Sequence, residues 1–405
     1  MNKNIKKKIL ALLIAETTIL SLPGCSKNNK KEESTQESTY AIELDDENAY
    51  KIKQNEDIPY LYNVIKYDAE KSKGKPYEMK AIQKSYDVKC TPSEFKKYTN
   101  NENITWEDLR KTVNNSMFDE YHKNIILDAI NNLEKNNFNI DLSVINYNIK
   151  NICVEYKEDL QEDVLGLFDC FNHKIYISKN IQNEKKYKIV FLHEILGHGM
   201  IDAYIDESKV YCSIDTPIFA TDTNNNYGGY ELYGRAFTEA MAQYIAILAT
   251  DKKLDEEYVC AYDLNMVELL MLCKDNNCSL VDFANNGIEY LTNKMKKNIS
   301  NPHELISLIS RNLDSVELGQ TTYKESETLI LNYYTERIDN LYYEGKTVEE
   351  MNSIISEIFN YSLQYVLTCE ENSCKLIGTE NDTVNLTRLY ENIGTYAYQN
   401  KKYTK

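Results

Sequence analysis

The chain has 405 residues, of which 42% are hydrophobic, 13 are glycine and 6 are proline. This length allows a sizeable hydrophobic core, and this composition excludes a low-complexity or fibrous protein. The formal net charge of −17 would repel a phosphate backbone, so we expect no nucleic-acid partner.

The first 25 residues have the pattern of a bacterial export signal. A lysine-rich start precedes the apolar run Ile9–Ala15, which is too short to cross a membrane as a helix. The sequence Leu22-Pro23-Gly24-Cys25 then resembles the lipobox of bacterial lipoproteins, which implies a lipid such as palmitate on Cys25. The alternatives are an ordinary secretory signal or a short membrane anchor. Residues 26–45 are polar and predict a flexible tether, so we expect a lipid-anchored protein on the outer face of the cell membrane.

The ten cysteines also fit an exported protein. Cys273/Cys278 and Cys369/Cys374 share one spacing, and each pair could close a small disulfide loop in an oxidising compartment. The alternative is a four-cysteine zinc site built from both pairs. Apart from Cys25, an odd number of cysteines remains, so we expect at least one free, buried thiol. Once the two spaced pairs are also set aside, the odd set is Cys90, Cys153, Cys170, Cys212 and Cys260.

Residues 46–145 carry mostly helical signals. Thr91-Pro92-Ser93-Glu94 and Thr105-Trp106-Glu107-Asp108 each begin with a helix-capping residue, followed three positions later by an acid. Apolar residues recur at helical spacing from Ile125 to Leu133. His122 lies beside this apolar face, and we interpret it as an ordinary histidine at the edge of the core.

A small β-sheet is predicted from residue 146 onward. Residues 152–156 form a short run of β-branched and aromatic residues, and 165–169 and 174–178 flank a turn at Asn172-His173. A helix is then predicted to begin near Asn183 and to end around Gly197 or Gly199. We divide the chain into a catalytic core over 146–250 and a helical region over 251–405.

The predicted helix carries His193-Glu194-Ile195-Leu196-Gly197-His198-Gly199. Zinc-binding helices usually space their histidines four apart, because that spacing brings both to one face. Here the spacing is five, which rotates His198 about 140° away from His193 on a regular helix. Either the motif is accidental, or the helix contains one extra residue as a π-type bulge, which Gly197 would ease.

A third ligand is predicted in the segment Tyr230–Ala246. Glu239, Ala242, Ala246 and Ala249 fall on one stripe of a helix. The small side chains allow this helix to approach the first one closely, so that the Glu239 carboxylate reaches the metal.

The first motif closely resembles the His-Glu-Leu-Leu-Gly-His-Gly motif of the dipeptidyl peptidase III family of zinc peptidases. The resemblance implies that His193 and His198 bind one zinc ion and that Glu194 is the general base. A carboxylate on the same helix can take the proton of a water whose pKa the zinc lowers. A small sheet before a metal-binding helix is also the layout of zincin peptidases, whose edge strand holds an extended peptide.

The second motif of that family is Glu-Glu-x-x-Ala-Glu, and it supplies the third zinc ligand. The sequence here matches it at Glu239 and Ala242 and departs from it at Thr238 and Gln243. An uncharged Gln243 can still orient a histidine. The resemblance covers two short motifs and implies zinc-dependent hydrolysis of peptides, but not the release of dipeptides.

Two residues are candidates for stabilising the transition state. Tyr233-Gly234-Arg235 resembles the lethal factor and Pro-Pro endopeptidase group, which implies that Tyr233 donates a hydrogen bond to the developing oxyanion. His303, at a predicted helix start, is the alternative. Tyr233 could equally be a packing residue, and His303 an exposed one.

Helical signals continue to the C-terminus. Ser279 and Thr347 are predicted capping residues, and Met351, Ile354, Ile355, Ile358 and Phe359 form an apolar face. The sequence therefore predicts a mainly α protein with a small β-sheet, in which helical regions flank a zincin-like core. The predicted function is peptide hydrolysis with one zinc ion. The alternative is a non-catalytic helical lipoprotein that binds peptides or another ligand.

Overall fold

The fold is described from a computed structural model of the chain. The structure describes residues 79–82, 88–100, 103–158, 160, 164–214, 219–222, 229–231, 234–250, 261–317, 324–363, 369–370, 373–377, 383–385 and 393. The predicted export signal, Cys25 and the tether lie outside these residues. Among the helices described, none has both the length and the apolar character needed to cross a membrane.

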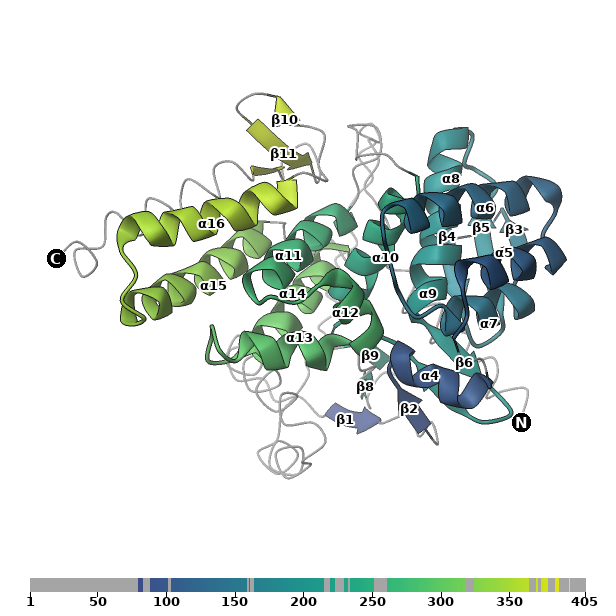
Figure 1. The fold of residues 1–405 in the computed structure, drawn as a ribbon, viewed down its shortest axis with the longest axis horizontal. Coiled ribbons are helices and arrows are strands. Elements are labelled where there is room, and N and C mark those ends of the chain that lie inside the picture. Colours follow the sequence, from purple (N-terminus) through teal and green to yellow (C-terminus); the bar gives the residue numbers. More distant parts are fainter. Residues whose placement is uncertain are drawn as a thin grey trace, which may run out of the picture.

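The described elements confirm a mainly α-helical protein with small β-sheets (Figure 1). The first helices are α4 (Pro92–Thr99), α5 (Trp106–Asn115), α6 (Glu120–Lys135), α7 (Ser143–Asn151), α8 (Glu184–Leu192), the π-helix η1 (His193–His198) and α9 (Gly199–Ile201). The later helices are α10 (Arg235–Ala249), α11 (Ala261–Asp275), α12 (Leu280–Asn286), α13 (Ile288–Met295), α14 (Pro302–Glu317), α15 (Lys324–Tyr343) and α16 (Val348–Leu363).

The described strands form four small sheets. Their bounds are β1 (Met79–Ile82), β2 (Val88–Cys90), β3 (Cys153–Lys157), β4 (Gly166–Asp169), β5 (Lys174–Ser178), β6 (Ala203–Ile205), β7 (Val210–Cys212), β8 (Phe219–Asp222), β9 (Gly229–Glu231), β10 (Cys369–Glu370), β11 (Ser373–Ile377) and β12 (Thr383–Asn385). The strand orders are β1-β8-β9, β2-β7-β6, β3-β5-β4 and β10-β11-β12.

Local sequence signals set several helix starts as predicted. Thr105 accepts a hydrogen bond from the Asp108 backbone N–H at 3.2 Å and donates its own N–H to the Asp108 carboxylate at 3.2 Å, which caps α5. Thr347 and Glu350 make the same reciprocal pair at the start of α16. Ser279 caps α12 by accepting from the Asp282 N–H at 2.9 Å.

The predicted hairpin lies directly before α8 and η1, the helical segment that leads to His193 and His198. Strands β4 and β5 pair antiparallel around a turn in which His173 has a φ of 54°, so this histidine is a turn residue as predicted. Strand β3 pairs parallel with β5 on the other side, so among the described strands β4 has one partner and an edge. Strand β4 also contacts η1.

Helix α10 is the central element of the core. All of its residues except Leu248 are buried, and it packs against α6, α8, η1, α11 and α14. In Figure 1 it lies between the part of the chain that contains α5–α9 with strands β3–β5 and the part that contains α11–α16. Helix α10 therefore contacts both parts of the fold.

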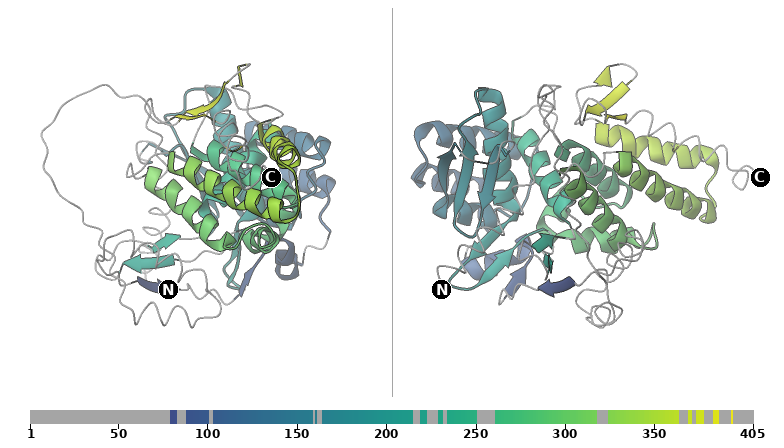
Figure 2. Two further views of the ribbon diagram at one scale, coloured as in Figure 1. Left: turned by 90° about the vertical axis from the view of Figure 1, so that its left-hand side faces the viewer. Right: turned by 180° about the vertical axis from the view of Figure 1, so that it is seen from behind.

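Helices α15 and α16 lie alongside each other and extend away from the β3–β5 sheet (Figure 2). A buried carboxylate on α11 fastens α15 to the core. Asp275 accepts from the Tyr333 hydroxyl at 2.6 Å and from Arg337 Nε at 3.1 Å. This pairing offsets the cost of burying the Arg337 charge.

Short strands also occur in the regions that the sequence predicted to be helical. Strand β2 pairs with β7, and β1 pairs with β8, more than a hundred residues later in the chain. Strands β10–β12 form their own sheet after α16. These strands are two to five residues long, and pairing between distant segments leaves no signal in local periodicity.

We expect Glu268→Gln to stabilise the protein above pH 5. Glu268 is buried on α11, accepts from Asn265 Nδ2 at 2.8 Å, and burial raises its pKa to about 8. The folded chain holds this proton, whereas the unfolded chain releases it near pH 4.5. The free energy of unfolding of the protein with the native glutamate therefore falls as the pH rises from 4.5 to 8. Glutamine removes this loss, which we expect to be roughly 2–4 kcal/mol at pH 8.

Urea unfolding at pH 4 and pH 8 measures this effect. The exposed Glu349 on α16 is the matched control, and Glu349→Gln should change neither curve. Equal effects of Glu268→Gln at both pH values would contradict the expected ionisation.

Candidate metal centre

The helix that carries both histidines contains the extra residue that the sequence spacing required. Asn183 caps α8 by accepting from the N–H groups of Lys185 and Lys186, and the helix then widens into η1. The Gly199 N–H donates to the Glu194 carbonyl, which is the i→i−5 bond of a π-helix. The wider turn restores a common face, and the ring centroids of His193 and His198 are 5.0 Å apart.

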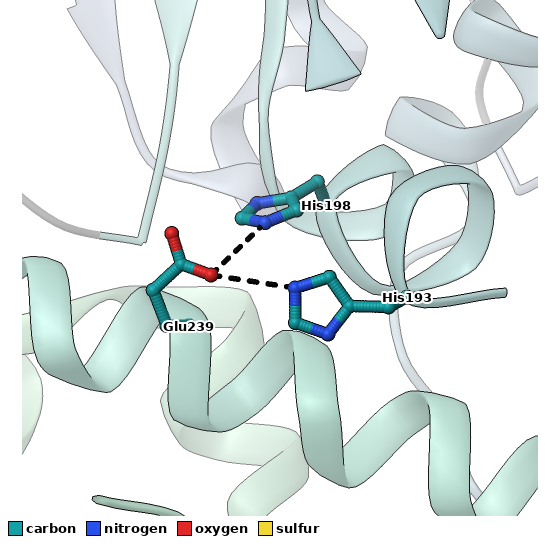
Figure 3. A group of neighbouring side chains, drawn as sticks. All are labelled: His193, His198 and Glu239. Carbon is teal, nitrogen blue, oxygen red and sulfur yellow. Dashed lines mark hydrogen bonds and ion pairs between the residues drawn. The ribbon is translucent and has the colours of Figure 1, made fainter. Parts of the chain in front are cut away.

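Helix α10 completes the cluster with Glu239. Glu239 Oε2 lies 3.3 Å from His193 Nε2 and 3.4 Å from His198 Nε2, as Figure 3 shows. All three ligand atoms lie within 4.8 Å of one another, and in the described part of the chain this is the one cluster of its kind. The structure therefore brings together the three predicted metal ligands, and they could hold a metal ion.

Gly197 allows the two helices to approach closely. A Cβ atom at this position would lie 2.7 Å from the Ala242 carbonyl oxygen and 2.8 Å from the Ala242 Cα, both closer than real Cβ contacts. Gly197 has no positive φ, so its role is this contact and not the relief of backbone strain that we expected from the sequence. The small-residue stripe on α10 has the packing role predicted for it.

Two residues behind His193 determine which of its ring nitrogens faces Glu239. His193 Nδ1 lies 3.0 Å from Gln243 Oε1, and Gln243 Nε2 donates to Asp263 Oδ1 at 3.0 Å. Because a carboxylate can only accept, Asp263 turns the amide oxygen of Gln243 toward the histidine. His193 Nδ1 therefore carries the proton, and Nε2 presents its lone pair toward Glu239. Tyr262 stacks on the ring with centroids 5.6 Å apart.

His198 has an equivalent support of its own. Its Nδ1 lies 3.2 Å from Asp202 Oδ2, and Asp202 Oδ1 accepts from the Ser213 hydroxyl at 2.6 Å. Phe168 of β4 stacks on the ring at 6.0 Å between centroids. A carboxylate that accepts from the far nitrogen of an imidazole is the usual partner of a metal-binding histidine, because it fixes the ring and raises its basicity.

The donor set requires a positive charge between its members. With both Nδ1 protons directed at Gln243 and Asp202, each neutral imidazole would point a lone pair at the Glu239 carboxylate, which is repulsive. Protons on the two Nε2 atoms or a metal ion would relieve this repulsion. Donors 2.0–2.1 Å from a tetrahedral metal lie about 3.3–3.4 Å apart, which fits the separations observed here.

The electrostatics of the centre agree with this requirement. Burial alone would raise the pKa of Glu239, but the charge of His198, the two histidine rings beside the carboxylate and the charge of Arg235 lower it well below its ordinary value. Burial would likewise lower the pKa of His198, but Glu239 and Asp202 raise it well above its ordinary value. The centre therefore favours an ionised Glu239 facing positive charge.

Glu194 lies between the metal cluster and strand β4. Its side chain is buried, and the Phe168 backbone N–H on β4 slightly lowers the pKa of its carboxyl. Burial raises the pKa of Glu194, although His193 and His198 partly oppose this rise. Gly166 of β4 lies so close that a Cβ atom there would stand 2.6 Å from Glu194 Oε1. A buried carboxylate with a raised pKa next to this cluster is able to accept a proton.

The other sequence candidates lie elsewhere or outside the described residues. Tyr233 is not among the described residues, so its predicted role is untested by this geometry. His303, the alternative donor, is the second residue of α14 and has Nδ1 3.6 Å from the Glu289 carboxylate. His122 is buried at the edge of the core and contacts the Tyr187 hydroxyl at 2.6 Å, as an ordinary structural histidine would. Cys273 and Cys278 are both free thiols in the structure.

Sequence reasoning identified Gln243 as a residue that could orient a histidine, but it missed the other residues that support the site. Asp202 follows His198 by four positions, the spacing that places two helical residues on one face, and this signal could have identified it. Asp263 lies twenty residues after Gln243 and on the next helix, and Gly166 lies on a strand. Only the tertiary packing brings these two residues to the site.

We expect Asp263→Asn to lower the zinc affinity by about tenfold or more, with zinc as the test metal. An asparagine can offer its NH₂ group to Gln243, which lets the Gln243 amide rotate and favours the wrong His193 tautomer. Gln243→Glu added to Asp263→Asn should recover the affinity, because the new carboxylate accepts from His193 and from the new amide. Competition with a chromophoric chelator measures all three proteins, and a double variant as weak as the single one would contradict this polarity argument.

His193, His198 and Glu239 are therefore candidate metal ligands, with Glu194 beside them in a position to exchange protons. No protein-family model, curated protein or solved structure matches this chain.

Proposed function

We propose that the chain is a zinc-dependent peptidase that hydrolyses peptide bonds on the outer face of the cell membrane. The observation that carries this proposal is the pair of imidazole Nε2 atoms that converge on Glu239 beside a buried Glu194. Two histidines and one glutamate are the ligand set of several catalytic zinc sites, which keep a fourth position for water or substrate. The resemblance of the two motifs to the dipeptidyl peptidase III family adds support to this proposal.

Each residue has a distinct role in the proposed reaction. Zinc held by His193, His198 and Glu239 would supply a lower pKa for a bound water and polarise the substrate carbonyl. Glu194 takes the proton of the attacking water and later returns it to the leaving amine. Its raised pKa brings it closer to neutral pH, where a general base both accepts and releases a proton readily.

A peptide is the proposed substrate because the proton acceptor faces the edge of a strand. The Ser178 N–H donates to the Leu165 carbonyl at 2.9 Å, and the alternation of an antiparallel pair then directs the Phe168 N–H away from β5. A Cβ atom on Gly166 of β4 would stand 2.6 Å from Glu194 Oε1, so this strand and the carboxylate adjoin. An extended peptide added to this edge would bring its backbone carbonyl groups close to the metal cluster.

Two further roles belong to this proposal. Tyr233, one residue before Gly234 at the start of α10, is proposed to donate a hydrogen bond to the developing oxyanion. Cys25 is proposed to carry the lipid that holds the enzyme at the membrane. A single acyl chain binds membranes only marginally, so more than one chain would be needed for stable anchoring.

Metal analysis combined with peptide digestion tests the proposed function. We expect the chain purified from residue 26 onward to hold about one zinc ion and to cleave members of a peptide library, with cleavage abolished by a chelator and restored by zinc. Glu239→Ala should lower zinc retention, because it removes one of three ligands. A folded protein that binds no zinc would overturn the proposal, and one that binds zinc and peptides without cleaving them would be the non-catalytic alternative.

A further inference from the structure

Two cysteines outside the metal centre lie opposite each other on neighbouring strands. Cys90 ends β2 and Cys212 ends β7, and the two are register partners in the parallel pair of these strands. Neighbouring strands run about 4.7–4.9 Å apart, which falls inside the range of Cα separations that a disulfide bridges. The backbone separation of the two strands is therefore compatible with a disulfide bond.

The two thiols adjoin in one small core and influence each other's ionisation. Cys90 Sγ donates a hydrogen bond to the carbonyl oxygen of Tyr211, the neighbour of Cys212 in the chain, at 3.7 Å. Cys212 is fully buried, whereas Cys90 is partly exposed at the rim of a small core that includes Phe95 and Val210. Cys170 is the alternative partner for a bond with Cys212, because a charge on Cys170 would also raise the pKa of Cys212.

We propose that Cys90 and Cys212 form a native disulfide bond, with a small-molecule or protein disulfide as the oxidant. The Cys90 thiolate attacks one sulfur of the oxidant and releases the first thiolate. The Cys212 thiolate then attacks Cys90 Sγ in the mixed disulfide, forms the Cys90–Cys212 bond and releases the second thiolate. The two protons of the cysteines pass to the released thiolates, so the oxidant disulfide is reduced to two thiols.

The local environment fixes the order of these attacks. The neighbouring Cys212 thiol lowers the pKa of Cys90, and burial raises the pKa of Cys212 well above its ordinary value. The thiolate is the reactive form, so the partly exposed Cys90 meets the oxidant first. Cys212 reacts second, because it is buried and can reach Cys90 but not an oxidant in solution.

The bond would fasten the segment before α4 to the strand that follows the metal helix. The chain between the two cysteines contains β3–β5, α8 and η1, and thus His193, Glu194 and His198. Ser213, the residue after Cys212, donates to Asp202, which in turn supports His198. A bridge at Cys212 therefore anchors one end of the chain of contacts that leads to a metal ligand.

Peptide mapping after oxidation tests the proposal directly. The full-length chain, purified reduced, is equilibrated with oxidised glutathione, blocked with N-ethylmaleimide and digested with trypsin. Lysines at 89, 157, 174 and 209 place Cys90, Cys170 and Cys212 on separate peptides. We expect a linked Cys90–Cys212 peptide that is absent after reduction. A Cys170–Cys212 peptide, or no linked peptide containing Cys212, would overturn the proposal.

Thermal unfolding of the same samples gives a second readout. A bond that fits the native strands should raise the Tm of the oxidised chain by about 5 °C or more over the reduced chain. Cys90→Ser should abolish this part of the redox dependence, and Cys170→Ser, the matched control, should keep it. A lower Tm of the linked form would overturn a native bond. Neither readout depends on zinc, so the result stands apart from the proposed peptidase activity.

Discussion

Glu194→Gln should keep the zinc content of the protein and lower kcat by about 10²–10⁴-fold, the usual contribution of a general base. Glutamine has nearly the same shape as the buried Glu194 side chain, so the fold of η1 should persist. Glutamine cannot take a proton from water, so kcat should fall while zinc binding is unchanged. Zinc content by mass spectrometry and peptide cleavage rates measure the two effects separately.

The control for this substitution is on the neighbouring helix. Glu184 in the first turn of α8 is exposed and pairs with Lys188 at 2.9 Å, so Glu184→Gln should leave both zinc content and kcat unchanged. Full activity of Glu194→Gln would contradict the role of this carboxylate as the base. Loss of zinc together with activity would instead indicate that Glu194 contributes to the metal site itself.

Gly197→Ala should lower both the stability of the fold and its affinity for zinc. The added Cβ would stand 2.7–2.8 Å from backbone and side-chain atoms of Ala242, and backbone atoms cannot rotate away as a flexible side chain can. We expect a loss of about 1–3 kcal/mol in the free energy of unfolding, as for other overpacked cores. Because α10 must move to relieve the contact, Glu239 should also be displaced from His193 and His198.

Gly199→Ala provides the matched comparison two residues later. A Cβ there would meet Ile145 Cδ1 at 3.0 Å, which is the end of a flexible side chain and not backbone. Its effect on urea unfolding and on zinc competition should be clearly smaller than that of Gly197→Ala. Equal effects of the two substitutions would contradict a specific contact between η1 and α10.

Much of the metal centre was predictable because its signals are local. The cap at Asn183 begins the helix, and the five-residue spacing of His193 and His198 leaves a π-type turn as the one geometry that lets both bind a common metal. Glu239 was predictable from its place on a stripe of small residues. The helix starts at Thr105, Ser279 and Thr347 follow the same local rules of capping.

The remaining features depend on contacts between distant parts of the chain. Asp263 supports His193 only because α11 packs on α10, and its sequence position carries no sign of that role. Gly166 leaves room for Glu194 only because β4 lies against η1. The pairing of β2 with β7, and with it the contact of Cys90 and Cys212, joins segments separated by more than a hundred residues.

The burial of α10 has a consequence for the rate at which a metal would exchange. Glu239 is on a helix enclosed by the core, and the two histidines are on a turn that Gly197 seats against it. Separating the ligands therefore means separating packed helices, an opening that costs far more than the movement of a surface loop. A metal bound here would therefore be released only when these packed helices separate. Its dissociation rate would be set by that slow opening as well as by the strength of its own bonds.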